Sequence, residues 1–243
     1  MSTVAIEHLR LQSARWGLSL SPSHVSLLTE YATILASYEL ANVVGTSSRE
    51  AIILEHLVDS LSCFLIEDLH RKNSLVDVGT GAGLPGIPLA IARSELHVAL
   101  LEVTQKKTRF LRHVAQELGL RNLEVLPGRA EEIGRCSTYR EAFDLATARA
   151  LATLPVLLEY CAPFVRRGGV ILAMKGRLPE EELSKGVTVS QQLGVALREV
   201  RSVNYPAPLP QKERRLVVFD KVDAIPERFP RRVGLAKKRP LGK

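Results

Sequence analysis

The residues best suited to chemistry lie in a glycine-rich segment, residues 75–88. Glycine permits sharp turns and lets bare backbone approach a ligand closely. Leu75, Val76 and Val78 form a short apolar run with β-branched residues, which predicts a buried strand. Pro85 suits the first turn of a following helix. A strand, a glycine turn and a helix N-terminus together predict a nucleotide-type binding corner at the carboxyl edge of a parallel sheet. The glycines of this segment are Gly79, Gly81, Gly83 and Gly86.

The spacing of this segment leaves two kinds of cofactor open. Gly81, Gly83 and Gly86 satisfy the G-x-G-x-x-G dinucleotide pattern. Asp77 extends it to D-x-G-x-G-x-G, the form typical of S-adenosylmethionine (SAM) sites, where a carboxylate suits the cofactor's ammonium and exposed N–H groups suit its carboxylate. Glu102 ends the next apolar run and can accept both ribose hydroxyls of either cofactor. The alternative is a purely structural role, in which Asp77 only caps the helix and the glycines only allow the helix to pack on the strand.

The elements that must position these residues follow an alternating pattern from Asn73 onward, which predicts a doubly wound α/β sheet. After the first strand we expect parallel strands at residues 97–103, 123–126, 143–147 and 170–174, the last preceded by a turn at 166–169. A proline-rich loop, residues 206–212, separates two further strands and predicts an antiparallel hairpin. This is the mostly parallel seven-stranded sheet of Rossmann-like class I SAM-dependent methyltransferases. The residues expected at the carboxyl ends of its strands are Asp77, Gly79, Glu102, Arg149 and Lys175.

Residues 1–70 read as a helical extension of this sheet. Ser21–Pro22 opens one helix. Ser47 and Glu50 have capping-box spacing and begin a second one. One turn of this second helix carries His56, Asp59 and Ser60. The predicted organisation is thus a helical extension (1–70), a methyltransferase core (71–222) and a basic tail (223–243).

Composition and charge narrow the class of protein. With 46% hydrophobic and 24% charged residues, the 243-residue chain is an ordinary globular protein. No apolar run approaches the roughly 18 residues of a membrane span, and we expect no signal peptide. Cys63, Cys136 and Cys161 have no C-x-x-C spacing, which predicts a reducing cytoplasm and neither disulfides nor a metal site. We expect a monomer.

Most of the net charge of +7 lies near the C-terminus, where residues 227–243 hold seven basic residues and one acidic residue. A solvated tail is the simple interpretation of such a charge run. However, apolar residues such as Phe229 and Leu241 interrupt the charges, so the segment is not a plain polybasic tract. A polyanionic partner, most commonly a nucleic acid, is the better interpretation.

The sequence also restricts the methyl acceptor. It has no N/D-P-P-Y/F segment after the fourth strand, which exocyclic-amine methylation usually employs, and Cys161 lies in a predicted helix rather than in a Pro-Cys nucleophile motif. A target with its own lone pair remains, such as N7 of guanine, which needs no general base. Alignment alone can then contribute up to about 7–11 kcal/mol. Arg149 and Lys175 are therefore assigned to phosphate, guanine O6 or cofactor contacts, not to proton removal.

Several linked motifs resemble the RsmG (GidB) family of bacterial 16S rRNA guanine-N7 methyltransferases, which modify the guanine numbered 527. They are the Asn42 loop, HLVDSL at 56–61, LVDVGTGAGLPGIPLA at 75–90, Ala148–Arg149–Ala150, Met174–Lys175–Gly176 and the basic tail. The tail departs from the family pattern in having Phe229 for tyrosine and Ala236 for proline. The resemblance implies SAM as cofactor and 16S rRNA of the small ribosomal subunit as partner.

Residue by residue, the resemblance places the SAM site on Gly79, Leu84, Glu102, Val103, Thr104, Ala130, Glu131 and Arg149. It leaves His56, Asp59, Arg149 and Lys175 as candidate active-site residues. Candidate RNA-binding residues are Lys175, Arg231, Arg232, Lys237, Lys238 and Arg239. The alternatives are a SAM enzyme acting on a protein or small molecule, an NAD dehydrogenase, and an RNA-binding assembly factor that only carries SAM.

Overall fold

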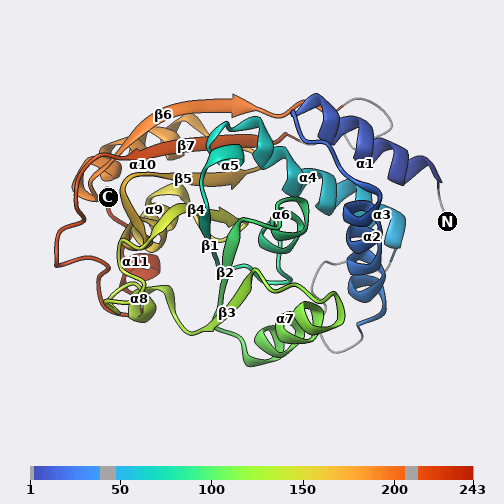
Figure 1. The fold of residues 1–243 in the computed structure, drawn as a ribbon. Helices are drawn as coiled ribbons and strands as arrows, with labels where there is room; N and C mark the ends of the chain where they lie inside the picture. The colour runs from blue at the N-terminus through green and yellow to red at the C-terminus, as the bar shows by residue number, and fades with distance from the viewer. Residues whose placement is uncertain (1–2, 39–47, 206–212, 243) are drawn as a thin grey trace.

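A twisted sheet crosses the molecule in this computed structural model, which describes residues 3–38, 48–205 and 213–242 (Figure 1). Within those residues the sheet has seven strands in the order β3-β2-β1-β4-β5-β7-β6. β1 to β5 run parallel, whereas β7 runs antiparallel to both β5 and β6. The predicted sheet, including its terminal hairpin, is confirmed. Its strands are β1 (Ser74–Val78), β2 (His97–Glu102), β3 (Leu123–Pro127), β4 (Phe143–Arg149), β5 (Val165–Lys175), β6 (Val195–Ser202) and β7 (Arg215–Lys221).

Both faces of the central strands β1 and β4 are buried, and successive side chains of a strand point to opposite faces. In β1, Leu75 joins a hydrophobic cluster with the N-terminal helices, while Val76 joins a second cluster on the other face. The strand order reverses between β1 and β4, and ligands of such sheets bind at the carboxyl ends of the strands near that reversal. The helices that follow the parallel strands are α6 (Gly86–Ala92), α7 (Gln105–Glu117), α8 (Ala130–Ile133), α9 (Leu154–Cys161) and α10 (Glu180–Gln192).

The N-terminal helices share the core of the sheet. α1 (Thr3–Arg15) and α2 (Pro22–Ser37) contribute buried residues to the same cluster as α6 and β2. Ser21 caps α2 and forms a capping box with His24, as the Ser21–Pro22 pair predicted. The Tyr31 hydroxyl donates a 2.6 Å hydrogen bond to the Ala82 carbonyl, so α2 also holds the glycine turn in place.

The second helical segment differs in detail from the prediction. Its cap is Ser48, whose hydroxyl accepts the Ala51 N–H at 3.3 Å; Ser47 lies outside the described residues. After α3 (Arg49–Ala51) the chain forms a π-helix, Ile52–Leu57, and then continues as α4 (Val58–Leu61). π-Helical turns are rare and are often found at functional sites. This one carries His56 and leads directly into Asp59. The 3₁₀ turn Ser62–Leu65 and α5 (Asp68–Arg71) complete the segment.

One prediction for the later chain is wrong in detail, and one alternative that the sequence left open does not hold. The turn expected at residues 166–169 belongs to β5, which begins at Val165 and bulges where its register against β4 shifts. The C-terminal residues 223–242 are not a solvated tail: they form a turn of helix, α11 (Leu235–Lys238), and bury Ile225, Phe229 and Ala236. Over the described ranges of the chain, no helix is long and apolar enough to cross a membrane.

Candidate active site

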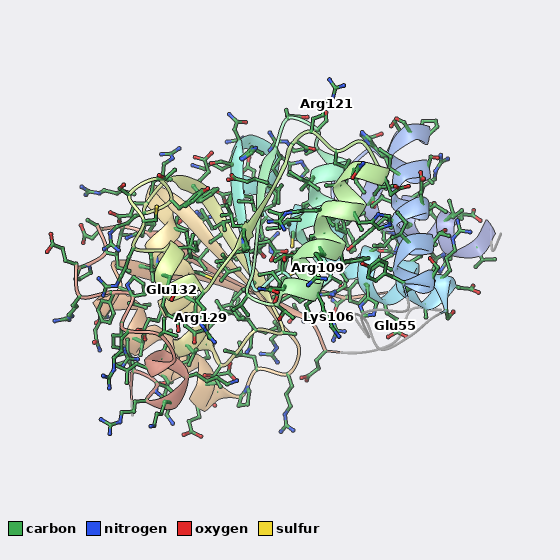
Figure 2. All side chains as sticks on the ribbon, turned by 90° about the horizontal axis from the view of Figure 1, so that it is seen from below. Glu55, Lys106, Arg109, Arg121, Arg129 and Glu132 are labelled. Atoms are coloured by element: carbon green, nitrogen blue, oxygen red, sulfur yellow. The ribbon has the colours of Figure 1, made fainter. Side chains whose placement is uncertain are left out.

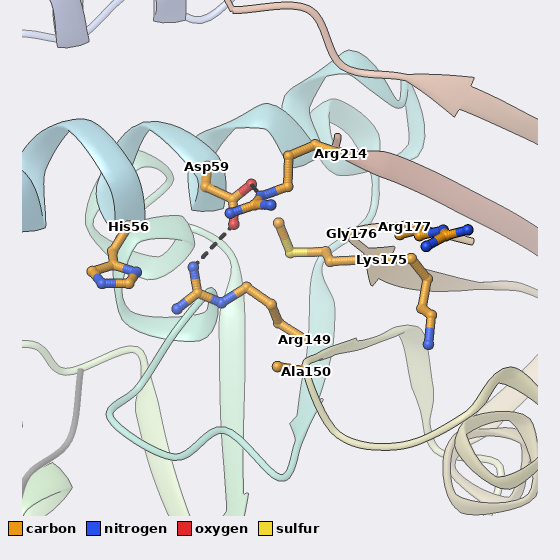
Figure 3. Close-up of a pocket in the computed structure, with 9 residues that line it drawn as sticks. His56, Asp59, Arg149, Ala150, Lys175, Gly176, Arg177 and Arg214 are labelled. Carbon is orange, nitrogen blue, oxygen red and sulfur yellow. Dashed lines mark hydrogen bonds and ion pairs between the residues drawn. The ribbon is translucent and has the colours of Figure 1, made fainter. Parts of the chain in front are cut away.

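Two cavities lie side by side at the carboxyl ends of the strands. One, of about 370 Å³, lies over β1, β2 and the turn before α8. The other, of about 330 Å³, lies over β4, β5 and α4 (Figure 3). Among the residues that line them, Ala150 is the one they share. Ala150 follows the last residue of β4 in a left-handed conformation, with φ +53°, which is unusual for a residue other than glycine.

The glycine turn forms the floor of the first cavity. Gly79 lines the cavity with φ +70°, and a Cβ there would come within 2.5 Å of the Leu151 side chain, so both backbone and space require glycine. Gly81, at φ +62°, is different, because a Cβ there would meet no atom nearer than the Gly79 carbonyl at 4.0 Å. Gly83 instead gives room to Ile87. The turn therefore combines one glycine beside open space with others that serve packing.

Glu102 is fixed at the edge of the first cavity. Its carboxylate accepts the Thr104 N–H at 2.8 Å and the Gly81 N–H at 3.1 Å, and only 5% of the residue is exposed. Each carboxylate oxygen keeps further lone pairs that can accept hydroxyl groups. The position fits the predicted ribose contact, because a rigid acceptor pair loses little entropy when a diol binds.

Asp77 lies beneath the turn rather than on the cavity wall. It is fully buried, and its Oδ2 accepts the Thr80 hydroxyl at 2.6 Å and the Gly86 N–H at 2.8 Å. The bond to Gly86, the first residue of α6, is the helix-capping contact expected if Asp77 has a purely structural role. Burial raises the pKa of Asp77 to about 6. Its Oδ1 has no hydrogen-bond partner in the described part of the chain, and an unpaired buried carboxylate oxygen gains from a nearby cation. The predicted contact with the cofactor's ammonium stays a prediction.

The remaining wall of the first cavity comes from the β3–α8 turn and from α9. The Gly128 N–H donates to the Glu102 carbonyl at 3.1 Å, which brings the turn against β2. Glu131 follows in α8 and is 5% exposed. Tyr160 of α9 faces it, and burial, followed by the Glu131 and Glu159 carboxylates, raises the pKa of its hydroxyl.

The structure thus brings together six of the predicted cofactor residues on one lining: Gly79, Glu102, Val103, Thr104, Ala130 and Glu131. Gly81 and Gly83 lie on the turn, Leu84 packs in the core beneath it, and Arg149 lines the neighbouring cavity. Sequence reasoning missed Lys107, Gly128, Arg129, Leu151 and Tyr160. The basic face of α7 gave a signal for Lys107, whereas Leu151 and Tyr160 look like ordinary core residues in the sequence.

Asp59 organises the second cavity. Its carboxylate accepts hydrogen bonds from Arg149 at 3.0 Å, from Nε of Arg214 at 3.0 Å and from the Tyr205 hydroxyl at 2.9 Å. Figure 3 shows the two guanidinium groups on either side of the carboxylate. Asp59 is 5% exposed, and burial, followed by its charge, raises the pKa of Tyr205. A carboxylate bonded to two guanidinium groups is a poor base, so this network is suited to orienting cations towards a bound anion or carbonyl oxygen.

Lys175 lines the second cavity but is held by contacts within the protein, and its predicted role stays a prediction. Its ammonium contacts the Ala152 carbonyl at 2.9 Å and the Glu182 carboxylate at 2.7 Å, and it points away from the Asp59 cluster (Figure 3). His56 lines the same cavity beside Arg149. Arg177 and Arg214 also line this cavity and were missed, because Arg177 follows β5 and Arg214 precedes β7 without a recognisable motif.

The candidate RNA-binding residues of the C-terminal segment separate into two groups. Arg231 bonds Glu159 through its backbone N–H and its guanidinium, and Glu159 is 1% exposed. Arg231 is thus already ion-paired within the protein, and its predicted contact with RNA stays a prediction. The other cations are exposed and form no ion pair with the described residues: Arg232, Lys237, Lys238 and Arg239.

A sheet with this strand order, a glycine turn above an acidic strand end and a carboxylate ending β2 defines a Rossmann-like class I SAM-dependent methyltransferase. The chain belongs to the GidB family, rRNA small subunit methyltransferase G, whose model matches residues 24–213. It is 46% identical over 238 residues to a ribosomal RNA small subunit methyltransferase G of Rubrobacter xylanophilus, covering 98% of this chain and 91% of that protein. A protein of the same name from Moorella thermoacetica is 40% identical, covering 93% of each chain. An O-methyltransferase family protein from Burkholderia thailandensis shares the fold, with a TM-score of 0.52, 12% identity and coverage of 68% of this chain and 55% of that one.

Proposed function

We propose that this protein transfers a methyl group from SAM to N7 of a guanine in 16S rRNA, the guanine numbered 527 in the small ribosomal subunit. The observation that carries the proposal is the pair of adjoining cavities that share Ala150, in a chain of the rRNA small subunit methyltransferase G family. The first cavity is assigned to the cofactor and the second to the acceptor base. The enzyme would act as a monomer in the cytoplasm.

The residues of the first cavity suit SAM. Glu102 would hold the ribose, the Ala130–Glu131 turn would receive the adenine, and open space beside Gly81 would receive the methionine end. Asp77 lies two residues before Gly79, and its buried Oδ1 has no hydrogen-bond partner among the described residues, so it suits the ammonium of SAM. When bound, SAM supplies an electrophilic methyl group on a sulfonium centre.

The second cavity suits an acceptor that needs no general base. Guanine N7 carries a lone pair and no proton, and two ionisable groups of this cavity are held by ion pairs: Asp59 by two arginines, and Lys175 by Glu182. Arg149 and Arg214 can donate to a phosphate or to guanine O6, but N7 must stay unpaired so that its lone pair can attack. The protein's contribution is then alignment of the base in a fixed orientation.

Cysteine nucleophiles are poorly placed for the alternative attack on a pyrimidine carbon. Cys161 is fully buried at the end of α9, and burial raises the pKa of its thiol far above neutrality. Burial does the same for Cys63. Cys136 is exposed but does not line either cavity. These positions favour a lone-pair acceptor.

RNA contacts are assigned to two exposed basic surfaces. On α7, Lys106, Arg109 and Arg112 recur three residues apart and therefore lie on one side of the helix. Figure 2 shows Lys106 and Arg109 extending from the same face of the molecule as Arg129, which lines the first cavity. The second surface consists of Arg232, Lys237, Lys238 and Arg239. Exposed cations of this kind bind phosphates. Such contacts supply affinity and fix the position of the RNA on the protein without reading its sequence.

The test is methyl transfer from labelled SAM to unmodified small subunits and, separately, to deproteinised 16S rRNA. The modified base would be mapped by cleavage at N7-methylguanine. One labelled guanine in either substrate is the expected result and shows which form is recognised. SAM binding without transfer to either substrate would contradict the proposal and favour the binding-factor alternative.

A further inference from the structure

The C-terminal segment is fastened to the wall of the first cavity. The backbone N–H of Gly234 donates a 2.8 Å hydrogen bond to the Glu131 carboxylate, and Glu131 lines that cavity. α11 lies against α9, which also contacts α8 (Figure 1). One residue that joins the segment to the sheet domain, Glu131, therefore also lines the first cavity.

Arg231 attaches the segment to α9 through three hydrogen bonds. Its backbone N–H bonds Glu159 at 3.1 Å, its Nε at 2.8 Å and its Nη2 at 2.6 Å. Glu159 is almost fully buried, so its carboxylate depends on this guanidinium for compensation. The next residue in α9 is Tyr160, which lines the cavity. The ion pair of Arg231 with Glu159 therefore lies one residue from the cavity wall.

We propose that Arg231 is a positioning residue for the cofactor: through Glu159, and together with the Gly234–Glu131 hydrogen bond, it fixes the α8–α9 wall that receives the adenine. This inference rests on the proposed function for the identity of the cofactor. Because binding couplings are reciprocal, docking of residues 228–238 tightens cofactor binding, and cofactor binding tightens the docking of that segment.

The chain offers a matched control in the next residue. Arg232 has the same charge and lies in the same basic segment, but it is exposed and forms no ion pair with the described residues. A role in cofactor positioning belongs to Arg231 alone, whereas a general contribution to RNA affinity would be shared by both. Comparison of Arg231→Gln with Arg232→Gln separates the two.

The first experiment measures SAM affinity by calorimetry and steady-state constants with small subunits. Arg231→Gln is expected to raise the Kd and the KM for SAM about tenfold, as loss of a charged hydrogen-bond pair predicts, with the KM for the subunit unchanged. Arg232→Gln is expected to leave the SAM affinity unchanged. Equal SAM affinity in folded Arg231→Gln and in the wild type would overturn the inference.

Removing Arg231 leaves a buried carboxylate, so a second variant guards against unfolding. The double variant Glu159→Gln/Arg231→Gln removes both charges and should fold, yet it should still bind SAM more weakly than the wild type. In the wild-type protein itself, saturating S-adenosylhomocysteine should slow hydrogen exchange at Gly234 and its neighbours. Exchange in residues 228–238 that is unaffected by this ligand would also overturn the inference. A wild type that binds no SAM would instead contradict the proposed function.

Discussion

The two cavities are built in opposite ways. At the centre of the first, backbone groups of the glycine turn after β1 meet Glu102 at the end of β2, joined by the Gly81–Glu102 hydrogen bond. The second is assembled from charged side chains that meet at Asp59, including Arg149 at the end of β4 and Arg214 before β7. The first cavity should be most sensitive to added side-chain volume, whereas the second should be most sensitive to the removal of a charge. Substitutions should therefore break the two cavities differently.

The largest effect is expected from Gly81→Val. A Cβ there would meet no atom nearer than the Gly79 carbonyl at 4.0 Å, so the valine side chain would extend into the open space assigned to the cofactor, and SAM affinity should fall by at least about 100-fold. Calorimetry measures the change. Gly119→Val is the matched control, because Gly119 has the same φ of +62° and a Cβ there would meet no atom within 4 Å. Both variants should lose similar stability, about 1–2 kcal/mol from left-handed strain. Normal SAM binding by Gly81→Val would place the cofactor elsewhere.

Asp59→Asn should disrupt the charge network of the second cavity and leave the first cavity intact. It removes the charge that holds Arg149 and Arg214, so single-turnover methyl transfer should slow by about 100-fold, the order of a lost charged network. SAM affinity should be unchanged. Asp220→Asn removes an exposed partner of Arg198 and serves as the control for loss of one acidic charge. Transfer at the wild-type rate in Asp59→Asn would show that the network does not orient the acceptor.

The pH dependence of Asp77 distinguishes capping from cofactor binding. Its folded pKa of about 6 exceeds its usual value of 3.8, so the contribution of Asp77 to the free energy of unfolding is fully present below pH 4 and is lost as pH rises through 6, by on the order of 3 kcal/mol. Asp77→Asn should flatten this part of the pH–stability profile, which denaturant titrations measure.

If Asp77 also attracts the ammonium of SAM, binding has the opposite dependence. Wild-type affinity should fall about tenfold as pH drops through 6 and the carboxylate is protonated, whereas affinity in Asp77→Asn should be lower and flat. Identical affinity profiles in the two proteins would leave Asp77 as a cap only.

The smallest effects are expected on the basic surfaces. Single substitutions Arg109→Gln and Arg232→Gln should each weaken RNA affinity a few-fold and reduce the slope of log affinity against log salt by about 0.7. Glu95→Gln, an exposed acidic residue, should not reduce that slope. Unchanged salt slopes in both arginine variants would remove these surfaces from the RNA interface.

The contrast between the cavities also explains what the sequence could predict. The turn and Glu102 could be predicted because short-range spacing determines which atoms meet. The Asp59 network could not, because Tyr205 and Arg214 reach Asp59 only after the terminal hairpin has paired with β5. Arg231 and Arg232 look alike in the sequence, and only the buried Glu159 distinguishes them. Lys175 was placed correctly at the end of β5, but its partner Glu182 comes from the following helix.

The most direct test of separate roles compares Glu102→Gln and Asp59→Asn in one assay. SAM affinity is measured by calorimetry, and the single-turnover rate with small subunits is measured at saturating SAM. Glu102→Gln should weaken SAM binding by about 10–100-fold, as loss of a charged acceptor predicts, while its rate recovers when SAM is saturating. Asp59→Asn should bind SAM normally and stay slow. If both variants lose SAM affinity and the rate at saturating SAM together, the two cavities do not have separate roles in cofactor binding and methyl transfer.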